Sequence, residues 1–132
     1  MSLTMSVMKN KLAVVKLKPK AKIPKWMLEE SFVSITRTSE ELSVVLEENL
    51  LGGYLDEIGN GEVFKGFVGL KVEGPLDFSL IGILSEITGI LAEVKVSVFV
   101  ISTFDTDYIW VNEGQVSKAI EVLEGKGISI NN

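Results

Sequence analysis

The sequence predicts an α+β protein made of two βαββαβ repeats, each an antiparallel sheet with its helices on one face. Three observations support this fold class. A strand–turn–strand pattern occurs twice, helical periodicity flanks its second copy, and shorter versions of the same elements surround its first copy. We place the repeats at residues 10–64 and 65–132, and leave residues 1 to about 9 out of the fold prediction.

The duplication aligns without a gap when residues 34–47 are placed on residues 100–113. Each copy has an apolar strand ending in Ser or Thr, a polar turn, a second apolar strand and an acidic residue. In the first copy, Thr38–Glu41 also matches a helix capping box, which would allow a helix over residues 40–48. The repeat favours a strand over Leu42–Leu46 instead.

The second copy has the ferredoxin-like order of elements. Apolar and β-branched residues predict strands at 67–73, 96–101, 108–111 and 128–130. Apolar residues at helical spacing predict helices over about 78–93 and 114–124. Strand, helix, hairpin, helix and strand in this order form an antiparallel sheet covered on one face.

The first copy is an abbreviated version of the second. Its expected elements are a strand at 12–17, one helical turn at 24–30, a hairpin of 32–36 with 42–46, and a stub of helix within 49–58. Gly52 and Gly53 should break that stub, because glycine is a poor helix former. The glycine-rich residues 59–61 are expected at the boundary between the repeats.

Two residue types are absent from the sequence, which contains neither cysteine nor histidine. The chain therefore cannot form disulfides, and it lacks the side chains that most often bind zinc and copper. Catalysis by a Ser-His-Asp triad or by a cysteine nucleophile is excluded as well. We expect no metal and no cofactor. The chain also lacks an apolar run of about 20 residues and a signal-peptide pattern, so we expect a cytoplasmic protein without membrane association.

Basic residues are concentrated near the start of a chain whose net charge is −5. Lys16, Lys18, Lys20 and Lys22 alternate at strand spacing, which is typical of an edge strand protected by lysines. Phosphate binding is the alternative. No aromatic residue is interleaved for base stacking, and the net charge opposes a polyanion, so we do not expect a nucleic-acid partner.

Several strings in the sequence resemble a known family. Residues 72–80 (VEGPLDFSL), 101–108 (ISTFDTDY), 23–26 (IPKW) and 32–38 (FVSITRT) look like the small stand-alone ACT-domain proteins. They are also similar to the regulatory tandem ACT region of aspartate kinases and to the cytosolic arginine sensors of animals. The resemblance covers about residues 11–130 and implies ACT-like repeats.

The resemblance further implies a small ligand, an amino acid or related metabolite, bound between two ACT units. The loop after the first strand and the end of the second strand would hold it. The positions that match these features are Glu73, Gly74, Pro75, Leu76, Asp77 and Phe78 in the loop, Ser102, Thr103 and Phe104 at the strand end, and Asp107 at the end of the STF-x-x-D motif.

The chemistry of these residues also allows structural interpretations. Asp77 suits a helix N-cap better than a ligand contact. Asp105 suits a turn-shaping role, and Asp107 suits a turn or a cationic group equally. Arg37 occupies the place of Thr103 in the repeat, and it would pair with a carboxylate or form a surface salt bridge. Phe78, Phe104 and Trp110 suit a core, an interface or a pocket wall.

We therefore expect a non-catalytic regulatory or sensor module that binds an amino acid at an ACT–ACT interface, as a homodimer. The alternative is a protein-interaction subunit that regulates a separate enzyme and has no ligand of its own. A ferredoxin-like nucleic-acid binder and an enzyme are disfavoured, because the sequence offers no basic aromatic surface and no identifiable pair of catalytic carboxylates.

Overall fold

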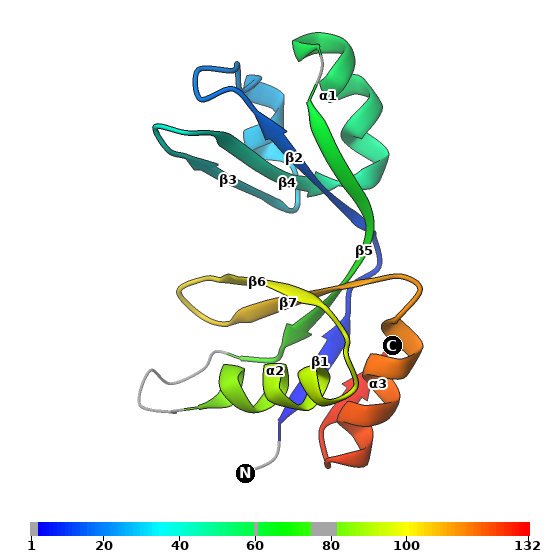
Figure 1. Ribbon diagram of the computed structural model, residues 1–132. Helices are drawn as coiled ribbons and strands as arrows, with labels where there is room; N and C mark the ends of the chain where they lie inside the picture. The colour runs from blue at the N-terminus through cyan, green and yellow to red at the C-terminus, as the bar shows by residue number, and fades with distance from the viewer. Residues whose placement is uncertain (1–2, 60, 75–81) are drawn as a thin grey trace. The chain divides into compact units, whose positions relative to one another are not determined.

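The computed structural model describes residues 3–59, 61–74 and 82–132, which form two compact units. One unit contains residues 10–66, and the other contains residues 1–9 together with 67–132. Strand β5 (Glu62–Val72) contributes to both units, because its first residues belong to one and its last residues to the other (Figure 1). Both units have the α+β, ferredoxin-like order of elements that the sequence predicts.

The N-terminal unit has the order β-helix-β-β-helix-β. Its elements are β2 (Leu12–Leu17), the 3-10 helix η1 (Lys25–Glu29), β3 (Val33–Arg37), β4 (Leu42–Glu47), the 3-10 helix η2 (Glu48–Leu50), α1 (Leu51–Ile58) and the first part of β5. The strands lie in the order β3-β4-β2-β5. The predicted strand at 42–46 is confirmed, since β4 pairs antiparallel with both β2 and β3.

One face of this sheet carries the core of the N-terminal unit. Alternate residues of β2 and β4 are buried there with Met27 from η1 and Tyr54 from α1. The prediction that Gly52 and Gly53 break α1 is wrong, because the helix continues through both. Each glycine costs a helix about 1 kcal/mol, and the burial of Tyr54 offsets part of that cost.

The edge-strand interpretation of the lysines is also wrong. Strand β2 lies between β4 and β5, so it is an inner strand. Only Lys16 belongs to it, where it forms an ion pair with Glu62 of β5 at 3.7 Å. Lys18, Lys20 and Lys22 follow the end of the strand. Their alternating spacing in the sequence is therefore not strand periodicity.

The C-terminal unit has the same plan with one additional strand. Its elements are β1 (Thr4–Val7), the last part of β5, α2 (Ile83–Glu93), β6 (Val98–Ser102), β7 (Asp107–Asn112), α3 (Val116–Gly125) and β8 (Ser129–Asn131). The strands lie in the order β6-β7-β5-β1-β8. Helix α2 has Gly82 as its N-cap, and the predicted cap Asp77 lies outside the described residues.

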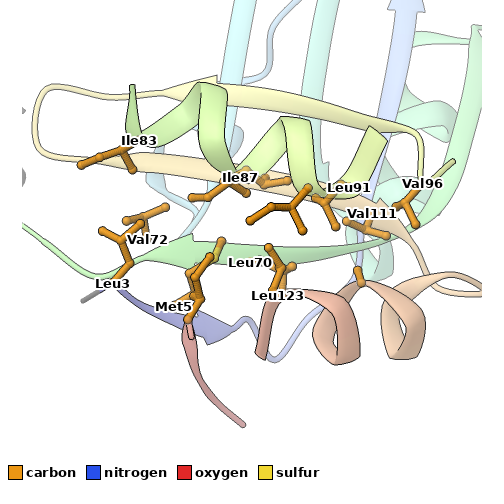
Figure 2. Close-up of a cluster of buried hydrophobic side chains, with 14 residues drawn as sticks. Leu3, Met5, Leu70, Val72, Ile83, Ile87, Leu91, Val96, Val111 and Leu123 are labelled. Carbon is orange, nitrogen blue, oxygen red and sulfur yellow. The ribbon is translucent and has the colours of Figure 1, made fainter. Parts of the chain in front are cut away.

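Both helices of this unit pack on the same face of the sheet. Ile83, Ile87 and Leu91 of α2 point toward β5 (Figure 2), and α3 adds Ala119 and Leu123 to the same buried cluster. The cluster also contains Leu70 and Val72 of β5 and Ile109 and Val111 of β7. The cluster takes every second residue of these strands, because successive side chains point to opposite faces of a sheet and the helices cover one face.

The exclusion of residues 1 to about 9 from the fold was wrong. Strand β1 pairs antiparallel with β5 and parallel with β8, so this sheet is not wholly antiparallel. Met5 is fully buried, and Leu3 also belongs to the core cluster. The alternation of Leu3, Met5 and Val7 was the available strand signal in the sequence.

The strand registers correct the alignment of the two repeats by one residue. The β3–β4 ladder pairs Arg37 with Leu42, and the β6–β7 ladder pairs Ser102 with Asp107. Equivalent hairpin residues of the two repeats are therefore 65 positions apart rather than 66, as Thr38 and Thr103 are. In this alignment Arg37 occupies the place of Ser102. The Arg37 guanidinium donates hydrogen bonds to the carbonyls of Pro19 and, at 3.3 Å, Ala21. It thereby fixes the loop after β2, a role that neither predicted interpretation included.

Within the described residues, no helix is both long and apolar enough to cross a membrane.

Candidate functional site

The β6–β7 turn is held by its own threonines. The Thr103 amide donates to the Thr106 carbonyl at 2.8 Å, and the Thr103 hydroxyl contacts both the Thr106 carbonyl and the Thr106 amide. Side-chain to backbone bonds of this kind stabilise tight turns. The turn therefore presents Asp105, which is exposed, in a fixed position.

A buried hydrogen bond ties this turn to the end of β5. Thr106 is 6% exposed, and its hydroxyl donates to the Val72 carbonyl at 2.5 Å. The next amide of the chain, that of Glu73, donates to the Thr4 carbonyl at 2.8 Å. Residues 73 and 74 therefore leave the sheet directly beside the β6–β7 turn.

The predicted residues Ser102 and Asp107 contact each other at the base of the turn. They are register partners in the β6–β7 ladder, and the Ser102 hydroxyl donates to Asp107 Oδ1 at 2.5 Å. The other carboxylate oxygen, Oδ2, can still accept a hydrogen bond, since an ionised carboxylate has about four lone-pair sites. Asp107 thus combines a structural bond with remaining acceptor capacity.

A polar cavity of about 200 Å³ lies between the end of β5 and the β6–β7 turn. Its lining residues are Lys71, Gly74, Thr103, Asp105, Thr106 and Tyr108. Lys71 and Tyr108 are register partners on adjacent strands, on the face opposite the core. The cavity therefore offers one ammonium group and one carboxylate to a small ligand.

The predicted site residues have different positions relative to this cavity. Gly74 and Thr103 line it, Glu73 is exposed next to Gly74, and Phe104 is 82% exposed rather than part of a core. Asp105, interpreted from the sequence as a turn residue, lines the cavity as well. Pro75, Leu76, Asp77 and Phe78 lie outside the described residues.

Sequence reasoning missed three lining residues, namely Lys71, Thr106 and Tyr108. Lys71 lies between the buried Leu70 and Val72, which assigns its side chain to the face of the strand opposite the core. Its proximity to Tyr108 depends on the strand pairing, which the sequence does not specify. Among the described residues, no group of three or more Asp and Glu side chains is placed to hold a metal ion.

Two family models match the chain. The model of the ACT domain matches residues 62–125, and a model of an N-terminal domain matches residues 10–52. Over 96 residues the chain is 33% identical to the cytosolic arginine sensor for mTORC1 subunit 1 of Rattus norvegicus. That similarity covers 72% of this chain, but the chain spans only 27% of the length of the rat protein.

Solved structures share the fold over nearly the whole chain. A protein from Agobacterium tumefaciens superimposes with a TM-score of 0.83 at 29% identity, covering 98% of this chain and 92% of the other. The regulatory subunit of aspartate kinase from Thermus thermophilus has a TM-score of 0.59 at 11% identity, with 92% and 95% covered. Residues 62–125 of the chain therefore match the ACT family, and the fold around them is shared with these solved structures.

Proposed function

We propose that this chain is a non-catalytic regulatory or sensor module that binds an amino acid or a related small metabolite in the cavity beside Gly74. The proposal rests on the observation that Lys71 and Asp105 line one cavity of about 200 Å³. An amino acid has a carboxylate and an ammonium group, which these two side chains complement. Gly74 adds a backbone without a side chain, which permits close approach of a ligand.

The relatives support this proposal. The rat relative is named as an arginine sensor, and structural neighbours include regulatory parts of aspartate kinases. We extend to this chain a role in the cytosol and an amino acid as ligand. We further propose that two copies form a homodimer, in which an ACT-like unit of the second copy completes the site.

Titration of the twenty amino acids, followed by thermal unfolding and calorimetry, tests the ligand. We expect a saturable rise in Tm with one amino acid or a small group of them, because a ligand that binds only the folded state stabilises it. Replacing Lys71 with Met or Asp105 with Asn should weaken that binding about 2- to 10-fold, as expected for the loss of a single charge contact that is at least partly exposed.

Lys65→Met is the matched control, because Lys65 is an exposed lysine of the same strand that does not line the cavity. It should leave the affinity within about twofold of the unchanged protein. A flat response of the unchanged protein to all twenty amino acids would contradict the ligand proposal. Sedimentation equilibrium should give twice the mass of the chain, and a monomer would contradict the dimer.

The second candidate function is a protein-interaction subunit without its own ligand. The exposure of Phe104, 82% at the tip of the β6–β7 turn, favours it, because an exposed aromatic residue is common in protein interfaces. Under this alternative, Phe104→Ser should abolish association with a partner enzyme while no amino acid changes the Tm. Under the ligand proposal, an amino acid raises the Tm of both the unchanged protein and the Phe104→Ser variant.

A further inference from the structure

The N-terminal unit has a second cavity, and it lies at the repeat-equivalent place. Its volume is about 430 Å³, and its lining includes Lys16, Lys18, Pro19, Glu40, Gly61 and Glu62. In the strand ladders, Lys16 pairs with Ser43 as Lys71 pairs with Tyr108. Lys16, Pro19 and Glu40 therefore stand where Lys71, Gly74 and Asp105 stand in the C-terminal unit.

The acidic residue of this second cavity is positioned by the same turn as its counterpart. The Thr38 amide donates to the Glu41 carbonyl at 2.9 Å, and the Thr38 hydroxyl accepts from the Glu41 amide at 3.1 Å. Thr103 makes the equivalent bonds to Thr106. Glu40 is thus presented beside the end of β2 as Asp105 is presented beside the end of β5.

Other contacts fix the walls of the second cavity. The Arg37 guanidinium binds the carbonyls of Pro19 and Ala21, so the loop that forms one wall is held in place. Gly61 also lines the cavity, and a Cβ atom on it would lie 2.8 Å from Leu17 Cδ2 and 2.9 Å from Val15 Cγ1. Only glycine permits this close approach to β2.

We propose that this cavity is a second binding site for an amino-acid zwitterion, so that each chain has one site per repeat. The ligand carboxylate is received by Lys16 and Lys18, and its ammonium group by Glu40. Glu62 partly neutralises Lys16 through their ion pair at 3.7 Å. The volume is about twice that of the C-terminal cavity, so the second site accepts the larger amino acid side chains.

Backbone amide NMR during titration with each of the twenty amino acids distinguishes the two sites. We expect one amino acid to shift the amides of Lys18, Glu40 and Gly61 in a saturable manner. Shifts confined to Gly74, Asp105 and Thr106 would overturn this second site while the proposed function stands. Shifts confined to the N-terminal set would support it and count against the proposed C-terminal site, and an absence of any shift would overturn both.

Charge-neutral variants test the chemistry of the second site. Glu40→Gln should raise the dissociation constant reported by the N-terminal amides about 2- to 5-fold, and leave that reported by Gly74 unchanged. Glu41→Gln is the matched control, because it removes the same charge one residue away and outside the cavity. This variant should change the dissociation constant reported by the N-terminal amides less than twofold. Equal effects of the two variants would overturn the assignment of Glu40.

Discussion

The two repeats close their hairpins with the same turn but place different residues beside it. In the N-terminal unit, the strand ends are Arg37 and Leu42, and Leu42 is fully buried. In the C-terminal unit the same positions hold Ser102 and Asp107, which bond to each other. The backbone of the turn is thus independent of its neighbours, which are free to supply either core packing or a polar site.

A second difference lies within the sheets. Val14 pairs with Val45 in the N-terminal unit, whereas the equivalent pair in the C-terminal unit is Gly69 with Trp110. The indole ring lies over the glycine, so a small and a large residue replace two of medium size. Close packing requires such compensation, because an overfilled site forces strain on its neighbours.

Adding a single methyl group at Gly69 should give the largest effect on stability. A Cβ atom there would lie 2.0 Å from Cζ3 of Trp110, so Gly69→Ala should lower the free energy of unfolding by about 2–3 kcal/mol. Urea denaturation measures this change. Trp110→Val, the residue type of the N-terminal unit, should reduce the penalty of Gly69→Ala in the double variant.

Gly89→Ala is the matched control for the change at Gly69. Gly89 lies within α2, and a Cβ atom there meets nothing within 4 Å. This variant should be more stable by about 0.5–1 kcal/mol, because alanine favours the helix. A Gly69→Ala protein as stable as the Gly89→Ala protein would show that the ring does not occupy the space above Gly69.

Removing the hydroxyl of Thr106 should give an intermediate effect. Thr106→Val leaves the buried Val72 carbonyl without this donor, so the free energy of unfolding should fall by about 1–2 kcal/mol. Its counterpart in the first repeat is Glu41, which is only partly buried. Circular dichroism during urea denaturation provides the measurement.

Thr88→Val tests whether this loss is specific to a buried carbonyl. The Thr88 hydroxyl donates at 2.8 Å to the carbonyl of Leu84, within helix α2. Because a helical carbonyl at i−4 also accepts a backbone bond, the loss should be within about 0.5 kcal/mol. Equal losses in the free energy of unfolding for Thr106→Val and Thr88→Val would show that the bond to the Val72 carbonyl stabilises the fold no more than an ordinary helical side-chain bond does.

The fold was largely predictable from the sequence, because period-two and helical patterns specify faces locally. The duplication correctly assigned Leu42–Leu46 to a strand where a capping-box motif favoured a helix. The alignment was nevertheless shifted by one residue, since only the ladder shows that Arg37 opposes Leu42. The order of strands was less accessible, as the inner position of β2 and the insertion of β1 depend on pairing between distant residues.

The candidate site was less predictable than the fold. Gly74 and Thr103 were identified through their sequence strings, and both line the cavity. Lys71 and Tyr108 were missed because they are neighbours only through the pairing of β5 with β7. A local motif therefore identified the loops of the site, whereas its charged lysine required the three-dimensional register.

The smallest expected effect concerns the phenol in the N-terminal core. Tyr54 packs beneath the sheet at the helix position that Ala119 occupies in the C-terminal unit, and its hydroxyl donates to the Lys22 carbonyl at 3.4 Å. Burial raises the pKa of Tyr54 above its usual value of 10.0, while the charge of Arg37 lowers it and that of Glu57 raises it. The neutral phenol is thus the form that the folded unit favours.

This raised pKa makes the stability of the protein depend on alkaline pH. Below pH 10 the phenol is neutral in both the folded and unfolded states, and its contribution is complete. As the pH rises through the folded pKa, the unfolded state ionises first and the free energy of unfolding falls. Tyr54→Phe should change stability by about 0.5 kcal/mol or less at pH 7, because the bond it removes is long.

At pH 11 the Tyr54→Phe protein should gain stability relative to the unchanged protein, because phenylalanine cannot ionise. Urea denaturation of both proteins at pH 8 and pH 11 measures this change, and the titration of lysines common to both cancels in the difference. A difference in free energy that stays constant between the two pH values would mean that the Tyr54 phenol ionises as readily in the folded unit as in the unfolded chain. The N-terminal core would then tolerate a charge at a position where the C-terminal core has only a methyl group.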